Sequence, residues 1–149
     1  MSALPTLLTA RCPQLALLLT AFAAGCRSAP STFVYTAEPT WAAIELRDDV
    51  DVDHAWTTVT DILARRFDLE MVSKESGYLR TNWLYTWTGK LRPDYAVRCI
   101  VKFPPGGRRC DLKSEAQYGS PGSWNYGTDT GLLQTLKTDI MGAIGRTTR

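Results

Sequence analysis

Hydrophobic side chains recur at helical spacing in two segments of the chain. The first begins at Asp51-Val52-Asp53, where acidic residues suit the positive end of a helix, and continues to Phe67. The second begins near Thr128-Asp129, which suits an N-cap, and continues to Ile144. Each segment is therefore predicted to be an amphipathic helix. The apolar positions are Val52, Ala55, Trp56, Val59, Ile62, Leu63 and Phe67, then Leu132, Leu133, Leu136, Ile140, Ala143 and Ile144.

Between the two predicted helices, apolar and polar residues alternate with a period of two, which is typical of strands with one buried face. Turns are predicted at 74–77, a polar stretch that ends in Gly77, and at 104–107, which reads Pro-Pro-Gly-Gly. Residues 41–46 are a candidate for one further short strand, and 119–131, rich in Gly and Ser, are predicted to be a loop. The alternating segments are 69–71, 79–87, 95–103 and 110–118.

This order of elements predicts an α+β fold. We expect a two-layer sandwich, in which an antiparallel sheet of four to five strands carries both helices packed on one face. Within segment 79–87, the period of two places Trp83, Tyr85 and Trp87 on the face shared by Leu79. These three aromatic residues then have two interpretations: plain core, or the lining of a cleft between sheet and helices that holds an apolar ligand.

The start of the chain has the composition of a secretory signal. Arg11 supplies a positive charge, 15–24 form an apolar run, and Ala23-Ala24-Gly25 supply small residues directly before Cys26. The run is shorter than the roughly 20 apolar residues that cross a bilayer. The pattern resembles the bacterial lipobox, at which Cys26 is acylated and the chain is cut before it; the alternative is a simple signal peptide that leaves Cys26 free.

The sequence thus predicts a lipoprotein signal peptide over 1–25, a tether over 26–40 that is rich in Ser, Ala, Pro and Thr, and a single domain over 41–149. The formal net charge is +2, and Arg11 is the one charged residue within 1–25, so the mature chain is nearly neutral. This balance argues against nucleic acid as a partner. The expected partners are the membrane, through the lipid anchor at Cys26, and another envelope protein.

The residue after Cys26 bears on the compartment. Asp at this position resembles an inner-membrane retention signal, and here the residue is Arg27. The expected location is therefore the cell envelope, on the periplasmic face of the outer membrane.

Two cysteines, Cys99 and Cys110, remain within the predicted domain. A turn centred on Pro105-Gly106 sets Cys99 opposite Leu112, which makes the two cysteines diagonal neighbours on one face. In an oxidising compartment such a pair favours a disulfide, and the alternative is two buried free thiols. Their spacing does not fit a zinc site or a redox motif, which require Cys-x-x-Cys or histidine partners.

The residues that could serve catalysis or metal binding are few. His54, the single histidine, lies in the first turn of a predicted helix without a nucleophile beside it in the sequence. Asp49-x-Asp51-x-Asp53 begins like a calcium loop, but His54 stands where that loop needs glycine. The sequence therefore predicts no enzyme, no metal and no cofactor.

Candidate contacts to a partner come from the predicted loop and the polar strand face. Trp124 and Tyr126 lie in the Gly- and Ser-rich segment, where aromatic residues are not obviously needed for packing. They either contact a partner or fold back over the sheet edge. Arg98, Lys113 and Glu115 lie on the polar face of the predicted strands and are the other expected contacts.

Three short stretches support a family resemblance: Trp56 near the start of the first helix, Phe67-Asp68-Leu69 at its end, and Gly77-Tyr78-Leu79-Arg80-Thr81-Asn82-Trp83. Together with the order of elements over roughly 42–144, they resemble the helix-grip domains of BamC-type lipoproteins of the outer-membrane β-barrel assembly machine. The resemblance implies a helix-grip fold. It also implies a non-enzymatic accessory or interaction subunit in outer-membrane assembly or maintenance. The alternative function is a binding module for a lipid or other apolar small molecule.

Overall fold

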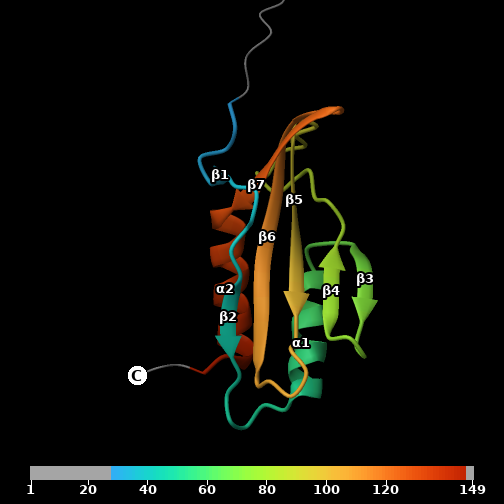
Figure 1. Ribbon diagram of the computed structural model, residues 1–149, viewed down its shortest axis with the longest axis vertical. Helices are drawn as coiled ribbons and strands as arrows, with labels where there is room; N and C mark the ends of the chain where they lie inside the picture. Colours follow the sequence, from blue (N-terminus) through green and yellow to red (C-terminus); the bar gives the residue numbers. More distant parts are fainter. Residues whose placement is uncertain (1–27, 147–149) are drawn as a thin grey trace, which may run out of the picture.

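The computed structural model describes residues 28–146, so the predicted signal peptide and Cys26 lie outside the described residues. The elements follow the predicted order, with two more strands than expected (Figure 1). They are β1 (Phe33–Tyr35), β2 (Ala42–Glu45), α1 (Val52–Ala64), β3 (Leu69–Ser73), β4 (Tyr78–Thr81), β5 (Tyr95–Lys102), β6 (Arg109–Ser120), β7 (Ser123–Asp129) and α2 (Thr130–Ile144).

Within residues 28–146, seven strands form one antiparallel sheet in the order β1-β7-β6-β5-β4-β3, with β2 also paired to β6. The long strand β6 organises this sheet. One edge of β6 pairs with β5 over its length, and the other edge pairs first with β2, at Ala42 opposite Leu112, and then with β7, at Gly127 opposite Ala116. The α+β class is confirmed, and the sheet is larger than the four to five strands predicted.

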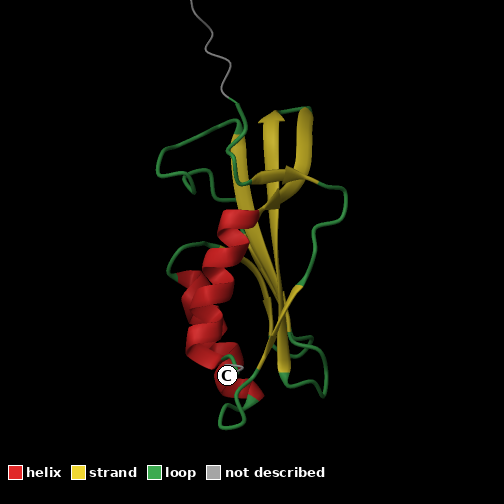
Figure 2. Ribbon diagram, turned by 90° about the vertical axis from the view of Figure 1, so that its left-hand side faces the viewer, coloured by secondary structure: helices red, strands yellow, loops and turns green. Residues whose placement is uncertain are grey.

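Helices α1 and α2 lie together on one side of the sheet and leave the other side uncovered (Figure 2). Both begin where the sequence predicts. The Asp51 carboxylate accepts a hydrogen bond from the backbone N–H of His54, and the Asp129 carboxylate accepts one from Leu132, each at 2.7 Å. These are N-cap hydrogen bonds, which satisfy backbone donors left free at a helix start.

The hydrophobic core lies between the helices and the sheet. Its members come from the inward face of α1 and α2 and from alternate positions of the strands, as the two periodicities require. The largest fully buried side chains are Tyr95, Ile44, Leu46, Leu63, Leu79, Leu112, Leu132, Leu136, Ile140, Ile144, Val59 and Val97.

The prediction of a loop over 119–131 is wrong, because most of this segment is strand β7. Strands β6 and β7 form a hairpin that turns at Pro121-Gly122. Gly119 has φ +142°, and a Cβ there would lie 2.3 Å from the carbonyl oxygen of Ser123. Glycine at position 119 therefore allows the two strands to approach. The glycines of this segment also interrupt the alternation of apolar and polar side chains, so the strand is not recognisable from the sequence.

Part of the predicted tether belongs to the sheet. Strand β1 pairs with β7, with Val34 opposite Thr128, so the ordered domain begins before residue 41. The ring of Phe33 packs edge-on against Tyr95, with ring centroids 6.0 Å apart. The Thr32 hydroxyl donates to the buried carboxylate of Asp129 at 2.8 Å. This strand has only three residues and one inward ring, which is too little periodicity to recognise in a sequence.

The predicted strand over 79–87 ends early, at Thr81. The backbone N–H of Cys99 donates to the Thr81 hydroxyl at 2.9 Å, so a side chain takes the place of a backbone acceptor where β4 leaves β5. Beyond this point the backbone pairs with β5 once more, at an isolated bridge between Leu84 and Val97. The expected shared face of Trp83, Tyr85 and Trp87 therefore does not form.

The structure contains Cys99 and Cys110 as free, buried thiols. Cys99 lies opposite Ser114, because the β5–β6 register differs by two residues from the one predicted. Cys110 lies opposite Ile44 of β2, on the other edge of β6. Of the two interpretations left open by the sequence, the free thiols are the one found. Burial raises the pKa of Cys110 to about 12 and raises that of Cys99 well above its ordinary value.

Candidate functional site

The candidate site is the face of the sheet turned away from the helices, called here the open face (Figure 2). Side chains of β5 and β6 alternate between the core and this face. Tyr95, Val97 and Cys99 belong to the core, so Arg98 between them points to the open face, as does Glu115 directly opposite it on β6.

Ion pairs run across the open face. Arg98 donates from Nε to the Glu115 carboxylate at 2.7 Å, and Lys113 approaches the other oxygen of Glu115 at 2.8 Å. Further along, Arg80 on β4 binds the Glu70 carboxylate through two hydrogen bonds of 2.9 and 3.0 Å. Arg98 also lies 4.0 Å from Glu70 and so links the two groups.

The central part of this network is poorly accessible to water. The side chains of Arg98, Glu115 and Lys113 are 22%, 18% and 17% exposed. Burial acts to raise the pKa of the Glu115 carboxyl, but hydrogen bonds from Lys113 and Arg98 outweigh burial and hold that pKa below its ordinary value. Glu115 is therefore a charged acceptor held by two cations on a sheet surface.

Aromatic rings lie beside these cations. The guanidinium carbon of Arg98 is 4.4 Å from the ring centroid of Trp83. The ring of Trp41 lies near two ammonium groups, 4.8 Å from Lys102 and 5.0 Å from Lys113. These distances are within the range of cation–π attraction, which orders long basic side chains on a surface.

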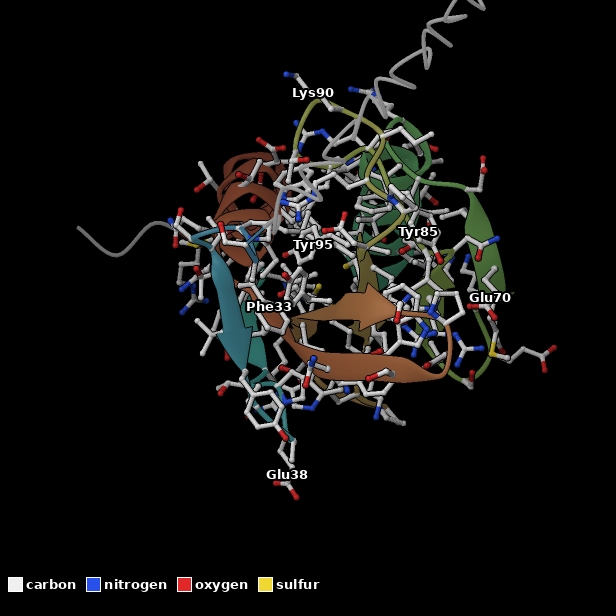
Figure 3. All side chains as sticks on the ribbon, turned by 90° about the horizontal axis from the view of Figure 1, so that it is seen from above. Phe33, Glu38, Glu70, Tyr85, Lys90 and Tyr95 are labelled. Atoms are coloured by element: carbon white, nitrogen blue, oxygen red, sulfur yellow. The ribbon has the colours of Figure 1, made fainter. Side chains whose placement is uncertain are left out.

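A hollow of about 210 Å³ opens on this face. Trp83, Arg98, Glu115 and Tyr126 line its sheet side, and the β1–β2 loop supplies the opposite side through Thr36, Ala37 and Pro39. Figure 2 shows this loop standing away from the sheet on the side opposite the helices, and Figure 3 shows Glu38 of the same loop pointing outward. The volume is below the roughly 300 Å³ of small-molecule pockets and suits one or two side chains of a partner.

The structure brings together most of the residues predicted as partner contacts. Arg98, Lys113 and Glu115 form the ion-pair network, and Tyr126, 57% exposed, lines the hollow beside them. Trp124 lies two residues before Tyr126 on β7 and is half-buried. The expectation of a loop is wrong for both aromatic residues, since they are held on a paired strand.

The residues predicted to line an apolar cleft are divided between two places. Trp83 lies in the hollow on the open face, and the Tyr85 hydroxyl accepts a hydrogen bond of 3.4 Å from Gln117, whose strand position also faces outward. Trp87 packs against the core. These three side chains do not form one cleft between sheet and helices.

Sequence reasoning missed Trp41 and Glu70, which also belong to the open face. Trp41 directly precedes β2. The first residue of β2, Ala42, lies opposite the core residue Leu112. Its outward position follows from strand alternation once this pairing is known. Glu70 lies at a register shift between Leu69 and Met71, so the period of two does not place it.

Catalytic and metal-binding geometry is not evident in the described residues. His54 is exposed at the start of α1, where its backbone N–H donates to Asp51. Within residues 28–146, no group of three or more His, Cys, Asp or Glu side chains is arranged to hold a metal ion. In the same part of the chain, no helix has the length and apolar character needed to cross a membrane.

Comparison with known proteins adds no family assignment. Neither the protein-family models nor the curated proteins searched contain a match to this chain. The chemistry and geometry of the open face are therefore the basis for a functional proposal.

Proposed function

We propose that this chain is a non-enzymatic lipoprotein of the cell envelope, anchored through Cys26, whose open face binds another envelope protein. The observation that carries the proposal is the hollow in which Trp83, Arg98, Glu115 and Tyr126 meet. Trp83 was expected to line an apolar cleft, and the other three residues were expected to contact a partner, but all four lie on one surface. This surface combines aromatic residues with arginine, which are common in protein interfaces.

The composition of the open face favours a protein partner. Aromatic residues and arginine are enriched in protein interfaces and supply most of their hot spots. Arg98 and Lys113 both pair with Glu115, so the group carries one net positive charge and each of its charged side chains has an opposite charge beside it. A partner that covers the group therefore buries paired charges and not isolated ones. A polyanion would require an excess of positive charge, which the nearly neutral mature chain does not offer.

The fold is in keeping with the role that the sequence resemblance implies. We infer a helix-grip-like two-layer sandwich, in which α1 and α2 cover one face and leave the other for binding. This arrangement supports an accessory or interaction subunit in outer-membrane assembly or maintenance, like the BamC-type lipoproteins. The stretch 77–83 that carries the resemblance contributes Trp83 to the hollow.

The alternative, a module that holds a lipid or apolar molecule between sheet and helices, has less geometric support. It requires Trp83, Tyr85 and Trp87 in one cleft, and Trp83 and Tyr85 lie on the open face. The side chains between the helices and the sheet pack as a buried core.

Site-specific photo-crosslinking in cells tests the proposal. A photoreactive amino acid replaces Tyr126 on the open face, and the matched control replaces Gln134, which is exposed on α2. We expect a discrete protein adduct at position 126 and none at position 134. Adducts of equal yield at both positions, or none at position 126, would contradict the proposal.

The anchor has its own test, the intact mass of protein extracted from membranes beside that of a Cys26→Ala variant. We expect a chain that begins at residue 26 and carries added acyl mass, and loss of both features in the variant. An unmodified chain would contradict the lipid anchor, and only the binding of a partner by the open face would remain of the proposal.

A further inference from the structure

The described chain begins at one end of the domain, close to a loop with an exposed apolar residue. The backbone carbonyl of Ser28 accepts a hydrogen bond of 3.1 Å from the guanidinium of Arg92. The same guanidinium binds the Asp94 carboxylate through hydrogen bonds of 3.1 and 2.5 Å. Residue 28 is thereby fixed to the loop between β4 and β5.

The distance from this point to the proposed anchor is short. Ser28 is two residues after Cys26, and two extended residues span at most about 7 Å. A lipid carried by Cys26 therefore holds this end of the domain at the surface of the bilayer. Contacts between that end and the lipids become intramolecular, with the high effective concentration that a short tether gives.

The loop beside Ser28 has the residues of a membrane contact. Leu91 is 70% exposed, and Lys90 projects away from the domain (Figure 3). The loop is held in shape by hydrogen bonds of 2.9 Å from Arg92 N–H to the Tyr85 carbonyl and from Gly89 N–H to the Thr86 carbonyl. Trp87 packs against the core and attaches the loop to the domain.

The charge at this end also suits a lipid surface. Between residues 82 and 94 the single acidic residue is Asp94, which Arg92 pairs. The sequence from 117 to 128, which forms the β6–β7 hairpin tip at this end of the sheet, contains no charged residue (Figure 1). Apolar and basic side chains without unpaired carboxylates are typical of segments that lie in a membrane interface.

We propose that the 86–91 loop rests on the membrane that holds the Cys26 anchor, with Leu91 inserted among the lipids and Lys90 at the headgroups. This inference rests on the proposed function, because the lipid at Cys26 supplies the proximity. The inference adds an orientation of the domain on the bilayer. The end that contains Ser28 and the 86–91 loop faces the lipids, and the open face stays accessible to a partner.

The experiment uses the full-length lipidated protein in vesicles of phosphatidylethanolamine and phosphatidylglycerol. A nitroxide label is attached at Leu91→Cys, and the matched control carries it at Met71→Cys, an exposed apolar position on β3. Cys99 and Cys110 are buried thiols and do not compete for the label. Accessibility to oxygen and to a water-soluble nickel complex reports the depth of each label.

We expect the label at position 91 to lie about 5–10 Å into the headgroup and acyl boundary, as for interfacial segments, and the label at position 71 to lie in water. Vesicle-bound protein with both labels in water would overturn the orientation while leaving the anchor intact. Equal burial of both labels would show that the protein adsorbs to the vesicles without a defined orientation, and would also overturn the proposal. An unacylated Cys26 in the intact mass would instead overturn the anchor in the proposed function, while the crosslinking experiment tests the binding role of the open face separately.

Discussion

Arg98 lies over the indole ring of Trp83, with its guanidinium carbon 4.4 Å from the ring centroid, and donates from Nε to Glu115 on the neighbouring strand. One side chain thus joins an aromatic ring from the segment after β4 to a carboxylate on β6. The contact fixes the position of Trp83, which no strand pairing holds. It also places the ring at the edge of the hollow, where a partner can reach it.

Partner binding should depend on this ring. Trp83→Ala is expected to weaken the interaction at least about tenfold, because tryptophan is among the residues that most often carry interface energy. The control is Met141→Ala, a truncation of an apolar side chain, 37% exposed, on α2. Crosslinking yield from position 126, or the affinity of the isolated partner, measures the effect. Equal losses in both variants would point to general destabilisation.

Glu115→Gln should lower the free energy of unfolding near neutral pH by about 1–3 kcal/mol, because the side chain loses its negative charge and one of the two oxygens that accept from Arg98 and Lys113. The folded pKa of Glu115 is lowered, so its stabilising contribution is present above the unfolded value of 4.5 and disappears as pH falls through the folded value. The difference between the two proteins in urea denaturation should therefore shrink with acidification. A constant difference down to low pH would contradict this account.

Gly127→Ala should separate β1 from β7. A Cβ at this position would lie 2.2 Å from the Val34 carbonyl oxygen and 2.9 Å from a ring carbon of Phe33. We expect a loss of about 1–3 kcal/mol, as for other overpacked sites, and faster proteolysis between residues 30 and 40. Gly142→Ala on α2 is the matched control, because a Cβ there meets nothing within 4 Å. Alanine also favours a helix more than glycine does, so this variant should lose no stability.

The two thiols should be inert in the folded protein. Burial raises the pKa of Cys110 to about 12 and that of Cys99 well above its ordinary value, and the thiolate is the reactive form. We expect no alkylation of either residue at pH 8 until denaturant is added, and two alkylations afterwards, counted by mass spectrometry. Failure to alkylate in denaturant without a reductant would show the disulfide instead.

The same shifts give a pH dependence in the alkaline range. A thiol whose pKa is raised by folding favours the native state fully below its unfolded pKa of 9.0. That contribution is lost as pH rises toward the folded value of about 12. Cys110→Ala should remove part of this alkaline decline in stability, at the cost of a small cavity in the core.

Much of the fold could be predicted because the longer elements carry clear periodicity. The helix starts at Asp51 and Asp129 were visible as capping residues ahead of apolar repeats, and both caps form. The wet faces of β5 and β6 were also visible, and with them Arg98, Lys113 and Glu115. Short or glycine-containing strands were not, since β1 has three residues and β7 includes Gly127.

The sequence by itself determined the helices, the main strands and which of their faces are buried, because these follow from local periodicity and capping. Tertiary structure decided what lies opposite what. The β5–β6 register differs by two residues from the expected one, and Cys99 therefore lies opposite Ser114. Because β4 ends at Thr81, Trp83 is free of the strand and packs against Arg98. A shift of two residues keeps every side chain on the same face of the sheet, so the hydrophobic pattern, which determines the faces, does not distinguish the two registers.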